Sequence, residues 1–159
     1  MTTAATKLQD KIIDDTEVSI QGGRDVALDA PTGTGKSRMF SKMAENAVDK
    51  GERTIILNNR KNLARQAATN LKRWADRDLS ISIGVEGNFD QSGDIVSTTV
   101  QTANLHIDEM LKYNRVVVDE GHHALEDNSD YTKLLDELQR RDPEIRMIAA
   151  SATFPDGME

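Results

Sequence analysis

Several features are missing from this sequence of 159 residues, and each absence narrows the possible function. The chain contains no cysteine, which excludes disulfide bonds, zinc-thiolate sites and thiol catalysis. No apolar run approaches the ~18 residues of a membrane-spanning helix, so no membrane partner is expected. Residues 1–7 have no apolar signal core, and a cytoplasmic location is therefore the default expectation.

Basic residues are outnumbered by acidic residues in this chain. The chain has 20 Lys and Arg residues against 27 Asp and Glu, a net charge of −7. A chain of this charge is not a general polyanion binder, so any contact with nucleic acid must come from a local basic patch. Hydrophobic residues make up 37% and charged residues 30%. These values and the chain length predict one soluble globular domain that buries about 70% of its unfolded surface.

A phosphate-binding loop is the strongest local signal. Residues 29–37, Asp-Ala-Pro-Thr-Gly-Thr-Gly-Lys-Ser, lie between a short apolar stretch and a segment with helical spacing. The two glycines allow successive backbone N–H groups to point at one anion. Lys36 can neutralise the β- and γ-phosphates of a nucleotide, and the Ser37 hydroxyl can bind Mg²⁺. The alternative is an ordinary glycine-rich turn, and Ala30 replaces the first glycine of the usual Walker A pattern. The predicted nucleotide-binding residues of this P-loop are Thr32, Gly33, Thr34, Gly35, Lys36 and Ser37.

A second chemical centre follows three consecutive valines at residues 116–118. Asp119 can hold Mg²⁺ opposite Ser37, and Glu120 can orient or deprotonate an attacking water. Alone, this acid pair could be a surface turn, but the phosphate loop upstream favours a catalytic pair. Metal binding by His122 and His123 is rejected. Adjacent histidines point in different directions, and zinc sites require three or four ligands.

Strand and helix signals alternate along the chain. Strands are expected near residues 26–28, 54–57, 79–85, 95–100, 116–118 and 145–150. Helices are expected near residues 6–16, 38–48, 61–75, 102–111 and 130–141. This alternation predicts an α/β fold with a mainly parallel central sheet covered on both faces. Ligands of such sheets bind beyond the carboxyl ends of the strands, which is where both chemical centres lie.

Three local expectations concern side chains. On the helix near residues 61–75 the expected buried stripe is Leu63, Ala67, Leu71 and Trp74. On the strand near residues 79–85 the expected buried face is Leu79, Ile81, Ile83 and Val85. His106 is expected at the surface. Residues 60–73 carry five basic and no acidic side chains. Charge alone favours a local basic face and an ordinary solvated helix surface about equally.

Together, the motifs resemble a known family. Residues 30–37, residues 117–123 (Val-Val-Asp-Glu-Gly-His-His) and residues 151–154 (Ser-Ala-Thr-Phe) resemble the first RecA-like domain of superfamily 2 DExH-box helicases. The chain is most similar to the branch of restriction-enzyme motors, RadD and UvsW-like proteins. The resemblance implies a three-layer RecA-like P-loop NTPase domain over residues 1–159, with ATP and Mg²⁺ as cofactors.

The same resemblance implies further roles. His122 matches the histidine that relays the nucleotide state, and Ser151 and Thr153 match the motif that couples hydrolysis to strand movement. Gln9 lies where an adenine-reading glutamine is expected, although Leu8 replaces the aromatic residue that often precedes it. Sequence-independent contacts to the sugar–phosphate backbone are implied for Arg60, Gln66, Thr99, Gln101 and Thr102. The resemblance thus favours the functional interpretation of the basic face.

The family motor uses two RecA-like domains, and the second is expected to be absent from this chain. That partner domain, in cis or in trans, would supply arginine fingers worth roughly 10³–10⁵ in rate. The isolated chain is therefore expected to hydrolyse ATP poorly. The branch resemblance favours DNA over RNA as the partner. One alternative is a stand-alone module that binds a protein or nucleic acid without motor activity. Another, a non-motor ATPase or kinase, is disfavoured by the Ser-Ala-Thr-Phe motif.

Overall fold

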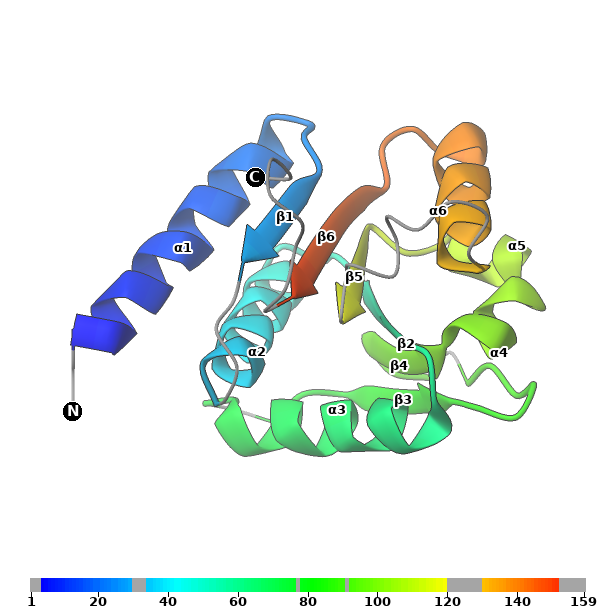
Figure 1. Ribbon diagram of the computed structural model, residues 1–159, viewed down its shortest axis with the longest axis horizontal. Helices are drawn as coiled ribbons and strands as arrows, with labels where there is room; N and C mark the ends of the chain where they lie inside the picture. The colour runs from blue at the N-terminus through cyan, green and yellow to red at the C-terminus, as the bar shows by residue number, and fades with distance from the viewer. Residues whose placement is uncertain (1–3, 30–33, 77, 91, 120–129, 152–159) are drawn as a thin grey trace.

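The computed structural model describes residues 4–29, 34–76, 78–90, 92–119 and 130–151 (Figure 1). Its strands are β1 (Val26–Asp29), β2 (Thr54–Asn58), β3 (Ile81–Gly84), β4 (Ile95–Thr99), β5 (Arg115–Asp119) and β6 (Arg146–Ser151). Its helices are α1 (Ala4–Gln21), α2 (Thr34–Asp49), α3 (Lys61–Trp74), α4 (Val100–Asn104), α5 (Ile107–Met110) and α6 (Asp130–Arg141). The strands form one sheet in the order β1-β6-β5-β2-β4-β3, and every described pair is parallel.

Helices cover both faces of this sheet, as the sequence predicts (Figure 1). One core cluster joins α1, α2 and α3 to alternate residues of the strands, including Ile56 and Val117. The other joins α4, α5 and α6 to the residues between them, including Ile55 and Val118. The central strands are apolar on both sides because both sides are buried. None of the described helices has the length and apolar character needed to span a membrane.

Helix α3 buries most of the predicted stripe but not Leu63. Leu71 is buried and Ala67 and Trp74 are half-buried, whereas Leu63 is 36% exposed. Ala64 and Ala68 are buried instead. The reason is close approach between α3 and its neighbours. The Ser97 hydroxyl of β4 donates a 2.6 Å hydrogen bond to the Ala64 carbonyl. Only a small side chain fits where a sheet residue reaches the backbone of the helix, so alanine takes the buried position.

Strand β3 differs in part from its expected one-sided burial. Leu79 and Val85, which flank it, are buried as predicted. Within the strand, which lies at the edge of the sheet, Ser82 and Gly84 are buried and Ile81 and Ile83 are half-buried. The segment after the strand folds back over it, because the Ser82 hydroxyl donates to the Asp90 carbonyl at 2.6 Å. The single helix expected near residues 102–111 is instead two short helices, α4 and α5. By contrast, α6 spans residues 130–141 as predicted.

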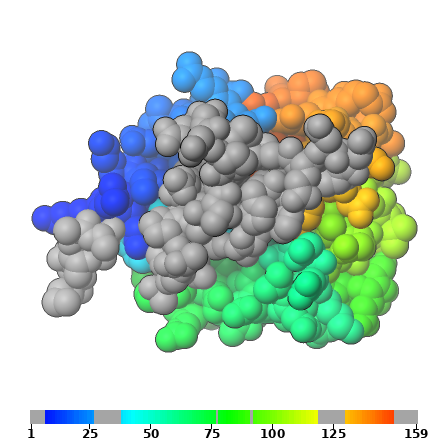
Figure 2. Space-filling model, viewed as in Figure 1, coloured from blue at the N-terminus to red at the C-terminus, as the bar shows by residue number. Residues whose placement is uncertain are grey.

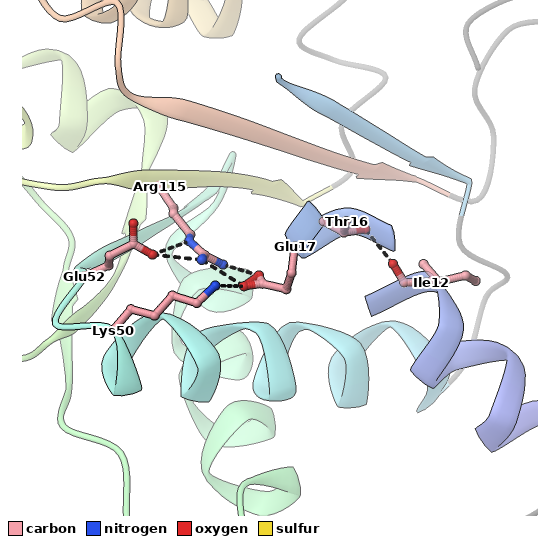
Figure 3. A network of polar contacts seen from close by, with 6 residues as sticks. All are labelled: Ile12, Thr16, Glu17, Lys50, Glu52 and Arg115. Carbon is pink, nitrogen blue, oxygen red and sulfur yellow. Dashed lines mark hydrogen bonds and ion pairs between the residues drawn. The ribbon is translucent and has the colours of Figure 1, made fainter. Parts of the chain in front are cut away.

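A buried ion-pair network connects α1 to the amino edge of the sheet (Figure 3). Arg115, the first residue of β5, is 2% exposed. Its guanidinium donates to both carboxylate oxygens of Glu17 on α1, at 2.6 and 2.9 Å. Glu52 accepts from the same guanidinium at 2.8 Å, and Lys50 donates to Glu17 at 3.1 Å. Bidentate geometry and several partners are what allow a buried arginine to stay charged without a large penalty.

The pKa of Glu17 shows which effect dominates in this network. Burial alone would raise the pKa, but the hydrogen bonds and positive charges of Arg115 and Lys50 outweigh it and hold the pKa below the ordinary value of 4.5. A carboxyl group with a lowered pKa stabilises the fold above pH 4.5. That contribution is lost as the pH falls through the lowered pKa of the folded state.

Replacing Glu17 by Gln should therefore destabilise the protein at neutral pH. The expected loss is about 3 kcal/mol, because Arg115 loses its bidentate charged partner. The difference between the variant and the wild type should begin to shrink below pH 4.5, where Glu17 of the unfolded chain becomes protonated, and it should be lost as the pH falls through the lowered pKa of the folded state. Urea unfolding at several pH values measures this difference. Glu86→Gln is the matched control, because Glu86 forms an exposed ion pair. Its removal should leave the free energy of unfolding nearly unchanged. A constant difference from pH 7 to pH 3 would contradict the assignment.

Candidate functional site

The carboxyl ends of the strands meet at one edge of the sheet, and several predicted site residues lie there. Asp29, the last residue of β1, pairs with Ser151 of β6. Asp119, the last residue of β5, pairs with Ala150 of the same strand. The backbones of Asp29, Ser151 and Asp119 are thus adjacent across three strands, and α2 begins at Thr34, shortly after β1 ends. This arrangement brings the start of the phosphate-loop helix and the predicted magnesium carboxylate to the same edge.

Some of the predicted residues lie outside the part that the structure describes. They are Thr32 and Gly33 of the phosphate loop, Glu120 and His122 after β5, and Thr153 after β6. Thr34, Gly35, Lys36 and Ser37 form the first turn of α2. The roles assigned to all of these residues stay predictions.

Gln9 lies beside the phosphate-loop helix. Its side-chain oxygen accepts a 3.0 Å hydrogen bond from Arg38 of α2, and Arg38 also pairs with Asp10 at 3.0 Å. The contact uses the amide oxygen of Gln9. Arg38 is a residue that the sequence analysis did not single out, because nothing local connects it to a residue 29 positions earlier. The structure therefore attaches Gln9 to α2 one residue after the predicted magnesium ligand Ser37, and its role in binding nucleotide stays a prediction.

The predicted nucleic-acid contacts come from adjacent strands at the same edge. Asn58, the last residue of β2, pairs with Thr99, the last residue of β4. Arg60 and Gln101 follow those strand ends by two residues each, and both are exposed. Gln66 is exposed on α3. The chain therefore brings these three side chains to neighbouring surface segments.

Thr99 and Thr102 have a different environment. Both are buried, and the Thr99 hydroxyl donates to the Thr102 hydroxyl at 3.0 Å. Thr99 also accepts from the Thr102 backbone N–H at 3.2 Å, so it caps the amino end of α4. The two hydroxyl groups are thus engaged inside the protein. Contacts from this segment to the phosphates of a nucleic acid would therefore be made by its main-chain groups and by the side chain of Gln101.

A tight turn at Glu86 and Gly87 contacts both segments that are predicted to bind nucleic acid, through Lys61 and through Thr102. Glu86 and Gly87 have positive φ values of 55° and 83°, as a two-residue hairpin-type turn requires. Glu86 pairs with Lys61 of α3 at 2.7 Å. The Gly87 carbonyl lies 2.8 Å from Nε2 of His106, whose ring stacks on Phe89 with centroids 5.6 Å apart. The expectation of a surface histidine is therefore wrong, because His106 is half-buried and anchors this turn.

The basic residues of α3 and the residue before it form an exposed surface, as Arg60, Lys61, Arg65, Lys72 and Arg73 are all exposed. In Figure 2 the teal-to-green atoms along the lower side of the view show this part of the chain at the molecular surface. On a chain of net charge −7, this local concentration of positive charge is where a polyanion would bind most favourably.

One residue at the carboxyl edge escaped the sequence analysis. Asn58 is 2% exposed, and within the described part of the protein neither polar atom of its carboxamide has a hydrogen-bond partner. An unsatisfied buried polar group costs about 1–3 kcal/mol, so such groups are rare unless something else occupies them. Only its place at the end of an otherwise apolar strand could have identified it.

The residues at this edge fit a hydrated magnesium–nucleotide. Magnesium is usually held by one or two carboxylates, by substrate phosphates and by water, and therefore needs no dedicated protein cage. The described residues contain no group of three or more His, Asp or Glu residues that could hold a metal. This edge contains the first turn of α2 with Lys36 and Ser37, the end of β5 at Asp119, and the unpaired buried amide of Asn58. These residue types match such a ligand.

Comparison with known proteins identifies the family and the fold. The family model of the DEAD/DEAH box helicase matches residues 6–159. No curated protein sequence matches the chain significantly.

Solved structures with the same fold include three that act as useful references. The restriction-modification enzyme LlaGI, a nuclease-deletion mutant with a DNA substrate mimic, is 15% identical with a TM-score of 0.67 over 92% of this chain. The Sulfolobus solfataricus SWI2/SNF2 ATPase core with double-stranded DNA is 18% identical with a TM-score of 0.74 over 92% of this chain. S. cerevisiae Dbp5 bound to RNA and ADP BeF3 is 21% identical with a TM-score of 0.65 over 84% of this chain. The chain spans 17%, 31% and 37% of these proteins respectively. These likenesses confirm the RecA-like fold, and the branch within the superfamily stays a prediction.

Thr102 should behave as a structural residue. Its hydroxyl accepts from the Gly87 backbone N–H at 3.1 Å, so Thr102→Val leaves a part-buried donor without a partner. The expected loss of stability is about 1–2 kcal/mol by urea unfolding. Gln101→Ala, on the exposed neighbour, should change stability by less than about 0.5 kcal/mol. Equal stability of the Thr102 variant and the wild type would show that the hydrogen bond contributes nothing.

Proposed function

The chain belongs to the DEAD/DEAH box helicase family, and from this we propose that it is the ATP-binding motor domain of a nucleic-acid translocase. The family and the RecA-like fold carry the general assignment to nucleotide-dependent helicase domains. The proposal adds that Mg²⁺-ATP binds at the carboxyl edge of β1, β5 and β6. It also adds that the nucleic-acid backbone binds along the adjoining edge of β2 and β4.

One observation carries the proposal more than any other. The parallel register aligns Asp29, Ser151 and Asp119 at a single edge, although they come from three separate parts of the chain. The phosphate-loop lysine and the acid pair were assigned from their local sequence patterns alone. The start of α2, which contains Lys36, and the end of β5 at Asp119 belong to this edge, which supports a common ligand because ligands of parallel α/β sheets bind beyond the carboxyl ends of the strands.

Within that site the roles follow from the chemistry of each group. Lys36 and the backbone amides of the loop would neutralise the phosphates, while Ser37 and Asp119 would hold the magnesium ion. Bound magnesium supplies positive charge to the phosphoryl oxygens. Glu120 would orient the attacking water, and His122, Ser151 and Thr153 would connect the nucleotide to the bound strand. Gln9, held by Arg38, would contact the base.

The partner is proposed to be DNA rather than RNA, with a second RecA-like domain completing the active site. Among the similar structures, LlaGI and the SWI2/SNF2 core are complexes with DNA, and Dbp5 is a complex with RNA. Competition between DNA and RNA oligonucleotides of one sequence would decide between them. Binding of neither would instead favour the alternative of a protein-binding module.

Lys36→Ala should abolish nucleotide binding. The wild-type chain should bind Mg²⁺-ADP measurably by isothermal titration, and loss of the lysine charge should weaken binding at least ~100-fold. Lys42→Ala is the matched control, because Lys42 lies on the same helix but pairs with Asp76 and Glu45. Equal affinity of the Lys36 variant and the wild type would exclude this loop as the phosphate site.

Arg60→Ala should weaken binding to a single-stranded oligonucleotide and flatten its salt dependence. Loss of one phosphate contact should reduce the slope of log K against log[salt] by about 0.7. Arg24→Ala serves as the control, because Arg24 is equally exposed but precedes β1, at the opposite edge of the sheet. Fluorescence anisotropy at 50–200 mM salt measures both slopes, and equal losses in both variants would mean that binding is diffuse rather than local.

A further inference from the structure

We propose that Asn58 belongs to the nucleotide site and that its carboxamide gains its hydrogen-bond partner only when Mg²⁺-nucleotide binds. The inference rests on the proposed function and adds to it a residue from β2. Nothing in the phosphate-loop or acid-pair patterns indicates a contribution from this strand.

The burial of Asn58 is the first observation. The side chain is 2% exposed, and neither its amide nitrogen nor its carbonyl oxygen has a partner among the described residues. A carboxamide has two donors and two acceptor sites, so it loses more than any other neutral side chain when it is buried unpaired. Burial of this kind is normally compensated by water or by a ligand.

The direction of the side chain follows from the alternation of β2. Ile55 and Leu57 pack in the cluster of α4, α5 and α6, whereas Ile56 packs in the cluster of α1, α2 and α3. Side chains two positions apart share one face of a strand. Asn58 therefore lies on the same face as Ile56, which is the face covered by the phosphate-loop helix α2.

The neighbours of Asn58 in the sheet give its position along the edge. On one side, Leu57 of β2 pairs with Val118 of β5. Asn58 and Asp119 are the next residues of these two strands, so they lie at neighbouring strand ends. On the other side, Asn58 pairs with Thr99 of β4. Asn58 thus lies between the strand end of the predicted magnesium carboxylate and the strand end of a predicted nucleic-acid segment. A partner for its amide must come from this edge, which is where nucleotide is proposed to bind.

Thr54 provides an internal comparison. Its hydroxyl is also buried without a partner among the described residues, it lies on the same strand, and by alternation it shares the face of Asn58. It differs in its location, ~13 Å away at the amino edge of the sheet, where no ligand is proposed. Thr54→Val and Asn58→Leu therefore each remove an unpaired polar group from one strand and one face, and only the second is next to the proposed site.

The experiment measures apo stability and nucleotide affinity separately for Asn58→Leu, Asn58→Ala and Thr54→Val. Melting temperature is recorded without ligand, and the Kd for Mg²⁺-ADP is measured by isothermal titration on the folded chain. Asn58→Leu should leave the apo Tm equal to or above that of the wild type, because an unsatisfied amide is replaced by an apolar group of similar shape. It should weaken Mg²⁺-ADP binding about tenfold, the effect of one hydrogen bond. Thr54→Val should leave the Kd unchanged.

The outcomes separate this inference from the proposed function. A Kd within threefold of the wild type in the Asn58 variants overturns the inference while leaving nucleotide binding intact. Asn58→Ala gives the answer if the larger leucine prevents folding. A loss of apo stability without a change in Kd indicates a structural role, as a permanently bound water would produce, and also overturns it. A wild-type chain that binds no Mg²⁺-ADP, although correctly folded, overturns both proposals.

Discussion

Parallel pairing of all six described strands is the constraint on which the rest of the structure depends. A parallel strand cannot be joined to its neighbour by a tight turn, so every connection must cross a face of the sheet. These crossovers account for the two helical layers and for the apolar character of the central strands, which have no solvent face. The same constraint directs every strand end to one edge. Chemical groups from distant parts of the chain become neighbours there without any need for local sequence proximity.

The two edges of the sheet hold different kinds of buried polar group: a charge network at the amino edge, beside the Thr54 hydroxyl that has no partner among the described residues, and an unpaired carboxamide at the carboxyl edge. At the amino edge, Arg115 is surrounded by Glu17, Glu52 and Lys50, and each charge has a partner. This network attaches α1 to the sheet at that edge. At the carboxyl edge, the Asn58 carboxamide has no partner among the described residues. Proteins tolerate unsatisfied buried groups mainly where function requires them. Of the two unpaired groups on β2, Asn58 is the one that lies beside the proposed nucleotide site, and Thr54 lies beside the charge network.

Local patterns in the sequence were sufficient for most of the elements and for the parallel sheet, but not for contacts between elements. Residues 130–141 show clear helical spacing and form α6 as predicted, whereas residues 102–111 do not form the single helix that was expected. On α3, Leu63 was misjudged because its size suggested burial, whereas packing against Ser97 requires the smaller Ala64. No local pattern could reveal that Glu17 and Arg115, 98 residues apart, share a buried ion pair. Asn58 was missed for a related reason, since its meaning depends on strand order.

Strand order also constrains how nucleotide and nucleic acid could influence each other. The predicted phosphate loop follows β1 and the predicted acid pair begins at the end of β5, whereas the predicted nucleic-acid residues lie at or after the ends of β2 and β4. Strand β2 lies between the strands of the predicted nucleotide site and those of the predicted nucleic-acid site, because it pairs with β5 on one side and with β4 on the other. A shift at the end of β5 reaches β4 through the end of β2 or through the helices above it. Packed strands move little in their interior, so their ends are where such a shift is least restrained. A polar residue at the end of β2 can therefore respond to both ligands, whereas the fully packed Ile55, Ile56 and Leu57 before it cannot.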